Sequence, residues 1–271
     1  MFKEDAEIRF EFLRPNQLLK RKEKCPLIFV PIGPLEYHGP HLPLGVDAIN
    51  ATICANEVCK RIGKGVVLPT IYFGTERERP PWLLKNLGFK STEWIVGMDF
   101  PTVLWKSHYY QEHTLGYVVS SKIEVLIDHD YKVVIIVNGH GAQNQKDTLD
   151  RLSKHYSNTT DSKVISELAF PDESIEIMGE HAGINETSLM LYYQREYNLG
   201  NLVDLSELPD KNTPIYYPDF SIVDSAGFSK NPDTDMMVKE DPRKATEKIG
   251  KEIFEKIVQK FLKITKNALK K

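Results

Sequence analysis

The sequence has few cysteines, no long apolar run and a start that is not expected to be a secretory leader. Its three cysteines, Cys25, Cys54 and Cys59, are an odd number without the C-x-x-C spacing of common zinc sites, so we expect buried small side chains rather than a disulfide framework. No apolar stretch approaches the length that spans a bilayer. The start, MFKEDAEIRF, is acidic and polar and is unlike a signal peptide. We therefore expect a cytoplasmic protein that has no membrane partner.

The sequence also lacks a large excess of charge of one sign. Its 271 residues carry a formal net charge of −3, and the Lys-rich end KITKNALKK is typical of a solvated helix end, so we expect no nucleic-acid partner. A hydrophobic content of 41% with 27% charged residues is ordinary for a globular protein with a sizeable core. With no internal repeat or linker, the length favours a single α/β domain over residues 1–271.

Short apolar runs alternate with helical patterns along the chain. The runs are rich in β-branched residues and bounded by Pro or Gly, which predicts buried strands. We expect these strands at 25–33, 65–74, 132–140 and 163–168. Helical spacing predicts a long helix over 102–128 and a final helix in which Pro242 takes the first position behind an Asp241 cap. This alternation predicts an α/β fold, a three-layer αβα sandwich with a mostly parallel central sheet.

Acidic and histidine side chains follow two of the predicted strands. Glu36 and His38 come directly after the first strand, in GPLEYHGPHLPLGVD, and His140 follows the strand that ends in VNGH. Functional groups gather beyond the carboxyl ends of parallel strands. Asp47 begins the next helix, where a carboxylate alone would simply complement the helix dipole. Together the four suit a site for Zn²⁺, Mn²⁺ or Fe²⁺, whereas we interpret His41 as a structural loop residue.

Four blocks of the sequence resemble the creatininase (creatinine amidohydrolase) family. GPLEYHGPHLPLGVD is similar to the family's E-x-HGPHLP-x-x-x-D signature, and VNGHGAQN to its strand end with NGH. EHAGINETS resembles the HAG-x-x-ETS segment, and DPRKATEKIGKEIF the late helix. The blocks occur in order over most of the chain, which makes the resemblance specific.

The resemblance implies roles for individual residues. Glu36, His38, Asp47 and His140 match the family's metal ligands, with Asp47 at the position of a carboxylate that bridges two ions. His181 matches a proton donor to the leaving group, and Glu180 an acid associated with it. The bound cofactor would be one or two divalent ions, Zn or Mn with Fe as an alternative, which activate a water for hydrolysis. Family members commonly form hexamers, which implies a homo-oligomer.

The match departs from creatininase itself at several positions. The strict enzyme has a Glu two residues after the strand-end His, where this chain has Ala142. Glu186, in the ETS segment, is either an additional ligand or a capping acid. In place of the Trp-Asp pair before the EHA stretch, this chain has Ile177 and Met178. We therefore expect a divergent member that does not act on creatinine.

The segment FGTERERPPWLLKNLGF replaces the family's usual short loop after the second strand. Its alternating charges are usual for a solvated loop. If the segment lines the site, Thr75, Arg77 and Arg79 would contact a small-molecule substrate that is polar. Family activities then favour hydrolysis of a keto-inositol ring of the 3-dehydro-scyllo-inosose type. The alternatives are cleavage of a cyclic amide or formamide, isomerisation of such a substrate, and a metal-binding homologue without activity.

Overall fold

The computed structural model describes residues 7–171, 181–222 and 241–270. Its elements in chain order are η1 (Phe10–Phe12), α1 (Pro15–Lys24), β1 (Leu27–Gly33), α2 (Val46–Ile62), β2 (Val66–Val67), β3 (Ile71–Tyr72), α3 (Pro81–Asn86), α4 (Glu112–Asp128), β4 (Val133–Asn138), α5 (Gln143–Thr159), β5 (Lys163–Leu168), α6 (Ile184–Glu196), η3 (Leu205–Glu207), α7 (Tyr217–Phe220), η5 (Pro242–Lys244) and α8 (Glu247–Ala268).

The described strands form one parallel sheet in the order β2-β1-β4-β5, and β3 pairs with the later part of β1. β1 and β4 are its central strands and are buried throughout. Ile32 is paired with Asn138, and Asn138 with Leu168, so these strands end at one edge. The fold predicted from the sequence, a mostly parallel sheet between helical layers, is confirmed.

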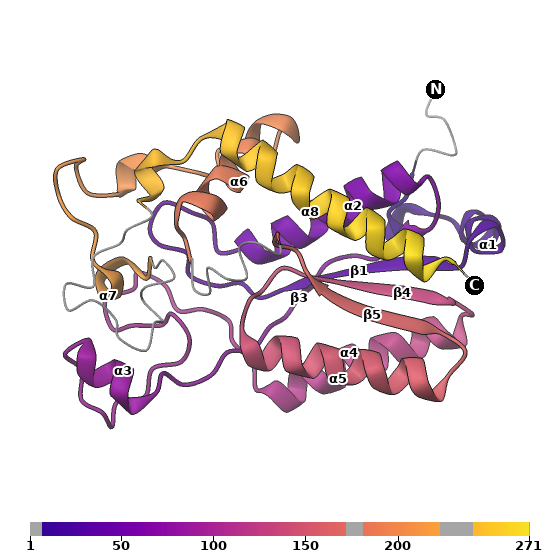
Figure 1. Ribbon diagram of the computed structural model, residues 1–271, viewed down its shortest axis with the longest axis horizontal. Coiled ribbons are helices and arrows are strands. Elements are labelled where there is room, and N and C mark those ends of the chain that lie inside the picture. The colour runs from indigo at the N-terminus through magenta and orange to yellow at the C-terminus, as the bar shows by residue number, and fades with distance from the viewer. Residues whose placement is uncertain (1–6, 172–180, 223–240, 271) are drawn as a thin grey trace.

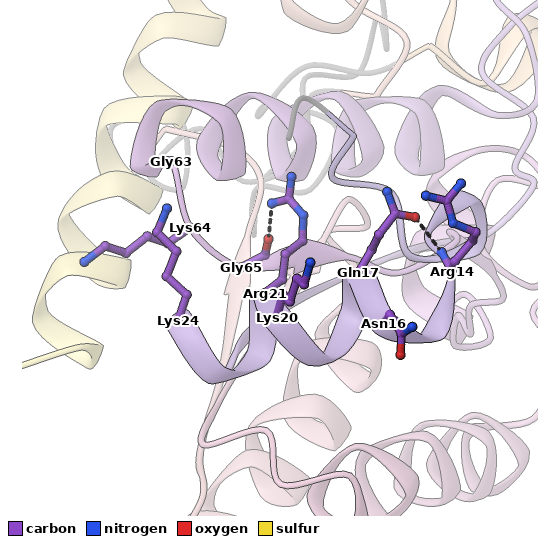
Figure 2. A pocket seen from close by; sticks show the side chains of 9 residues that line it. All are labelled: Arg14, Asn16, Gln17, Lys20, Arg21, Lys24, Gly63, Lys64 and Gly65. Carbon is purple, nitrogen blue, oxygen red and sulfur yellow. Dashed lines mark hydrogen bonds between the residues drawn. The ribbon is translucent and has the colours of Figure 1, made fainter. Parts of the chain in front are cut away.

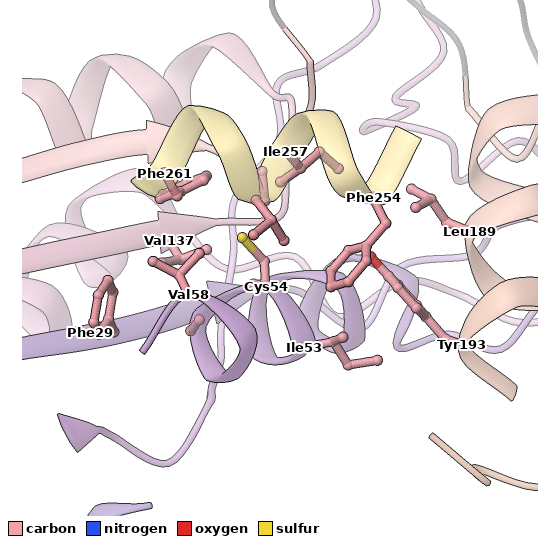
Figure 3. Packing of buried hydrophobic residues seen from close by; sticks show 14 of the residues in the cluster. Phe29, Ile53, Cys54, Val58, Val137, Leu189, Tyr193, Phe254, Ile257 and Phe261 are labelled. Atoms are coloured by element: carbon pink, nitrogen blue, oxygen red, sulfur yellow. The ribbon is translucent and has the colours of Figure 1, made fainter. Parts of the chain in front are cut away.

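Helices cover both faces of the sheet (Figure 1). In that view α2, α6 and α8 lie above the strands, and α4 and α5 lie below them. Figure 3 shows the upper layer, where Phe254 and Phe261 of α8 pack with Cys54 of α2 and Tyr193 of α6. All three cysteines are buried and free, as expected. Within the described ranges, no helix is both long and apolar enough to cross a membrane.

Three expected elements have different boundaries. The helix predicted over 102–128 is wrong in its first part, because α4 begins at Glu112. Before it, the backbone nitrogens of His108 and Tyr110 donate to carbonyls in other segments, 2.7 and 2.9 Å away. The strand predicted over 65–74 is two short strands, since Pro69 between them has no N–H to give. Asp241 caps only a 3-10 turn, and α8 begins after it.

Candidate metal centre

Five acidic and histidine side chains gather at the carboxyl edge of the sheet, beyond β1 and β4. Each is at most 5% exposed to solvent. They are Glu36, His38, Asp47, His140 and Glu186. The register of β1 with β4 brings the residues that follow these strands side by side. We call these five residues the ligand cluster.

Asp47 lies in the middle of the ligand cluster and reaches both histidines. Its Oδ1 atom is 3.4 Å from His38 Nε2, and its Oδ2 atom is 2.8 Å from His140 Nδ1. Glu36 Oε2 lies 3.1 Å from the same His140 nitrogen. Possible ligand atoms of Glu36, Asp47 and His140 all lie within 4.8 Å of one another. The same holds for His38, Asp47 and Glu186. The two trios share Asp47, and each of its oxygens faces a different histidine.

Two glycines allow the first turn of α2 to lie directly against the sheet edge. A Cβ on Gly139 would be 2.0 Å from the Asp47 carbonyl oxygen, and one on Gly33 would be 2.8 Å from the Ala48 nitrogen. Both distances are far inside van der Waals contact. A side chain at either position would displace Asp47 from the histidines. The glycine of the NGH stretch is therefore required for close approach of two backbones.

Glu186 enters the ligand cluster from the first turn of α6. Its Oε2 atom accepts a hydrogen bond from the Ala182 nitrogen at 2.6 Å and lies 3.7 Å from His38 Nε2. Ala182 has a φ of +56°, a left-handed conformation that is unfavourable for a non-glycine residue. The bond from Ala182 holds that conformation. The carboxylate of Glu186 thus accepts a hydrogen bond from the backbone before α6 and also lies close to His38.

Backbone carbonyls orient two of the imidazoles. His38 Nδ1 lies 3.0 Å from the Glu36 carbonyl oxygen, and His181 Nε2 lies 2.7 Å from that of Tyr37. Each of these nitrogens donates its proton to the carbonyl, which leaves Nε2 of His38 and Nδ1 of His181 for other partners. The two ring centroids are 4.2 Å apart, and His181 forms a further close group with Glu36 and His38. Glu180 lies outside the described residues.

Within this cluster, buried carboxylates and imidazoles stabilise the charged forms of their neighbours and so shift several of their pKa values. Burial would raise the pKa of Glu36, but His140 holds that pKa well below its ordinary value. Burial would lower the pKa of His38, but Glu186 and Asp47 raise it well above its ordinary value. Glu36 and Asp47 raise the pKa of His140 in the same way, against the effect of burial. In the protein alone, protonated histidines balance the buried carboxylates.

The donor set fits a divalent cation. Oxygen and nitrogen donors converge here as Zn²⁺, Mn²⁺ or Fe²⁺ would require. Among the described residues, the carboxylates of the ligand cluster form ion pairs with histidines and with no Lys or Arg. His38 Nε2 and Asp47 Oδ2 are buried without a hydrogen-bond partner, since the 2.8 Å contact of Asp47 with His140 is not aligned as a hydrogen bond. Such buried unpaired atoms are rare in proteins, and a bound cation would satisfy them.

Tyr109 supports the ligand cluster from the segment before α4. Its hydroxyl donates to Glu36 Oε1, and its ring centroid is 6.3 Å from that of His140. A Cβ on Gly97 would be 2.6 Å from the Tyr109 ring, so the surrounding loop closes tightly on it. Sequence reasoning missed this residue because the segment has helical spacing and a lone tyrosine there indicates only packing.

His41 ties the loop between β1 and α2 to its surroundings. Its Nε2 atom is 3.0 Å from Thr187 Oγ1 on α6, and its carbonyl accepts a bond from the Asp204 nitrogen at 3.1 Å. Burial and then the nearby His38 lower the pKa of His41 to about 3. The ring is therefore neutral, and its contacts are those of a structural residue.

The residues predicted to contact substrate bind protein groups in this structure. Thr75 is buried, and its backbone nitrogen donates to a glutamine of α5 at 3.0 Å. Arg79 donates to the Gly97 carbonyl and its side chain is only 11% exposed. Arg77 is exposed, with its Nη2 atom 3.4 Å from Asp147 Oδ2. Of the three, Arg77 alone has a largely exposed side chain.

A parallel sheet between helical layers, with carboxylates and imidazoles at its carboxyl edge, is an architecture that suits a metal-dependent enzyme, and comparison with known proteins gives its class as a hydrolase. The family profile described as creatininase, creatinine amidohydrolase, matches residues 12–265. The chain belongs to the creatininase family, as a divergent member.

Three characterised relatives have different activities. The creatinine amidohydrolase of Pseudomonas putida is 25% identical over 214 residues, which are 72% of this chain and 73% of the relative. A 2-amino-5-formylamino-6-ribosylaminopyrimidin-4(3H)-one 5′-monophosphate deformylase of Methanothermobacter thermautotrophicus is 28% identical over 189 residues, 70% of this chain and 64% of its own. The 3-dehydro-scyllo-inosose hydrolase of Thermotoga maritima is 34% identical over 65 residues, 24% of this chain and 21% of its own.

Solved creatininase structures share the fold. The crystal structure of creatinine amidohydrolase aligns with 98% of this chain and 99% of its own, with a TM-score of 0.66 and 24% identity. Creatininase in a Mn form gives a TM-score of 0.65 at 24% identity, over 98% of this chain and 100% of its own. A creatininase variant in a Zn–Zn form gives a TM-score of 0.66 at 23% identity, over 98% of this chain and 99% of the variant's chain.

Proposed function

We propose that the chain holds two divalent ions, Zn or Mn with Fe as an alternative, and hydrolyses a small polar cyclic substrate. One ion would be held by Glu36, Asp47 and His140, and the other by His38, Asp47 and Glu186. The position of Asp47 carries the proposal, because its two oxygens lie 3.4 and 2.8 Å from different histidines. A carboxylate so placed can bridge two ions.

Glu186 would supply a carboxylate to the second trio, although this chain lacks the Glu that creatininase has two residues after the strand-end His. This chain has Ala142 there, which offers no ligand atom. Glu186 comes from α6 and lies 3.7 Å from His38 Nε2. With it, the second trio keeps two carboxylates and one imidazole.

The residues around the ions would orient water and move protons. When bound, the ions would activate a water and polarise the substrate carbonyl. Because His181 Nε2 donates to the Tyr37 carbonyl, Nδ1 is the His181 atom that can take up a proton and pass it to the leaving atom. Tyr109 holds Glu36 Oε1, which turns Oε2 toward His140. We also propose Glu180 as an acid that assists His181, on the family resemblance alone.

The substrate that we propose is a keto-inositol of the 3-dehydro-scyllo-inosose type, whose ring C–C bond is hydrolysed. The loop after β3 is polar, and the exposed Arg77 could bind ring hydroxyls. Thr75 and Arg79 would act by shaping this loop through their contacts with protein groups. The similarity to the Thermotoga maritima inosose hydrolase supports the same substrate.

A second candidate is hydrolysis of the C–N bond of a cyclic amide or formamide. The deformylase relative aligns over 189 residues, against 65 for the inosose hydrolase. A proton from His181 would serve a departing amine as well as a departing carbon. By family resemblance we also propose a homo-oligomer, with a hexamer as the expected form.

A substrate panel with added Mn²⁺ or Zn²⁺ distinguishes these activities. The panel contains a keto-inositol, creatinine and a formylated aminopyrimidine nucleotide, each followed by product analysis. We expect ring opening of the keto-inositol and no turnover of creatinine. Release of formate, or hydrolytic opening of the creatinine ring, would instead favour the second candidate, and turnover of none of the three compounds would contradict both.

Metal content tests the ligand assignment independently of substrate. We expect two ions per chain in the wild type and one in Glu186→Gln. Glu124→Gln is the matched control, because Glu124 on α4 accepts a bond from Tyr156 at 2.6 Å and lies outside the ligand cluster. It should retain two ions. Equal metal content in the wild type and Glu186→Gln would remove Glu186 from the ligand set.

A further inference from the structure

A cationic pocket lies at the opposite end of the sheet from the ligand cluster. Its volume is about 450 Å³, and it lies between α1 and the turn that joins α2 to β2 (Figure 2). That turn contacts the start of β1, since a Cβ on Gly65 would be 2.8 Å from the Leu27 carbonyl oxygen. Glu36, by contrast, follows the end of β1. The pocket is therefore separate from the proposed metal centre.

Five of the residues that line the pocket are cationic and none is acidic. The cationic residues are Arg14, Lys20, Arg21, Lys24 and Lys64. The pocket brings together two segments that are far apart in the sequence, so no basic stripe is visible in the sequence itself. This concentration of charge contrasts with the formal net charge of −3 of the whole chain.

One face of α1 forms the first wall. Arg14, Gln17, Arg21 and Lys24 have the spacing that places side chains on one side of a helix. Gln17 Oε1 accepts a bond from the Arg14 nitrogen at 2.9 Å and so fixes the first turn. Leu18 packs against the hydrophobic core between the sheet and helices α4 and α5. The helix thus presents its cationic face to the pocket before any ligand is bound.

The turn after α2 forms the second wall. Gly63 and Gly65 have φ angles of +69° and +84°, and Lys64 lies between them. Arg21 Nη1 donates to the Gly65 carbonyl across the pocket at 3.3 Å (Figure 2). Basic residues near a helix end often complement the helix dipole. Lys60 and Arg61 occupy the last turn of α2, and Arg21 and Lys24 the last turn of α1, where they complement the helix dipoles. Lys20 and Lys64 lie outside these last turns, so the dipoles do not account for them.

We propose that this pocket binds a small anion that carries two or more phosphate groups. Within the described residues, Lys20, Lys24 and Lys64 form no ion pair, so their charges are available to a ligand. The volume is in the range of small-molecule sites. Guanidinium groups bind phosphate in a bidentate manner and ammonium groups bind it as point charges. The two sites lie at opposite ends of α2, whose first turn holds Asp47 and whose C-cap is Gly63.

Calorimetric titration of the metal-loaded protein with sodium tripolyphosphate at low salt tests the proposal. We expect one site whose affinity falls at least about tenfold in Lys20→Glu/Lys64→Glu, from the loss of charge-assisted contacts. Lys251→Glu, a charge reversal at an exposed position of α8, should bind as the wild type does. Lys20→Gln/Lys64→Gln should show an intermediate loss, and circular dichroism establishes that each variant is folded.

Two comparisons separate the pocket from other sites for the probe. Tripolyphosphate also binds metal ions, so the titration is repeated with Asp47→Asn, and the site should persist there. Citrate should bind more weakly than tripolyphosphate. Unchanged affinity in Lys20→Glu/Lys64→Glu, or loss of the site in Asp47→Asn, would overturn the proposal. Tighter binding of a DNA duplex than of tripolyphosphate would reassign the surface to nucleic acid.

Discussion

Replacing Gly139 with alanine should disable metal binding while the protein stays folded. The new Cβ would lie 2.0 Å from the Asp47 carbonyl oxygen and 2.6 Å from its carbonyl carbon. Restoring contact at about 3.5 Å requires the first turn of α2 to withdraw by roughly 1.5 Å. Ligand distances in metal sites tolerate only about 0.2 Å. We therefore expect metal affinity to fall by more than the roughly 10–100-fold that follows loss of an outer hydrogen-bond partner.

The stability cost should be smaller than the total stability of the protein. Overpacking of a core typically costs about 1–3 kcal/mol, against about 5–15 kcal/mol for unfolding a domain. The matched control is Gly141→Ala, on the other side of His140, where a Cβ would meet no atom within 4 Å. Zinc affinity is measured by competition with a chromophoric chelator, and folding by circular dichroism. If Gly139→Ala binds zinc as tightly as Gly141→Ala, the close approach of Asp47 to the strand end does not position the ligand.

Three further predictions concern other parts of the structure. Gly250→Ala should lower the free energy of unfolding by about 1–3 kcal/mol, because its Cβ would lie 1.9 Å from a backbone oxygen of α6. Gly116→Ala, whose nearest neighbour is 3.8 Å away, should instead raise it by about 0.5–1 kcal/mol in the same urea titration. Tyr109→Phe removes the donor to Glu36 and should weaken zinc binding by about 10–100-fold with little change in the urea midpoint. Burial lowers the pKa of His41 from 6.5 to about 3. The neutral buried ring therefore does not oppose folding above pH 6.5, and the free energy of unfolding decreases as the pH falls from 6.5 toward 3, because only the unfolded chain takes up the proton. His41→Gln should therefore reduce the slope of unfolding free energy against pH by up to about 1.4 kcal/mol per pH unit in that window, and an unchanged slope would mean that the ring is not held neutral.

The central strands and the residues beyond them could be predicted because their signals are local. β1 and β4 are continuous apolar runs, and their ends carry Glu36, His38 and His140 within a few residues. Strand ends of a parallel sheet share one edge, so the grouping follows from the fold class. The resemblance to creatininase then indicated the family, which the comparison confirms.

The missed features depend on contacts between distant segments. The start of α4 is set by bonds from His108 and Tyr110 to the carbonyls of Leu35 and Gly74, and no local pattern encodes them. The same course of the backbone between His108 and Tyr110 places the Tyr109 hydroxyl against Glu36. For a similar reason, the spacing of the ETS segment left the role of its Glu open, whereas the structure places that carboxylate beside His38.

A newly synthesised chain acquires the proposed ligands in stages. Glu36, His38 and Asp47 emerge from the ribosome first, His140 follows with β4, and Glu186 appears only with α6. At about 5–20 residues per second, several seconds separate the first group from the last. Until then the second trio can hold an ion only weakly, because Glu186, one of its three proposed ligands, is missing. Stable loading of the proposed metal centre would therefore be an event of the last part of translation, and it would mark chains in which α6 has docked onto the sheet.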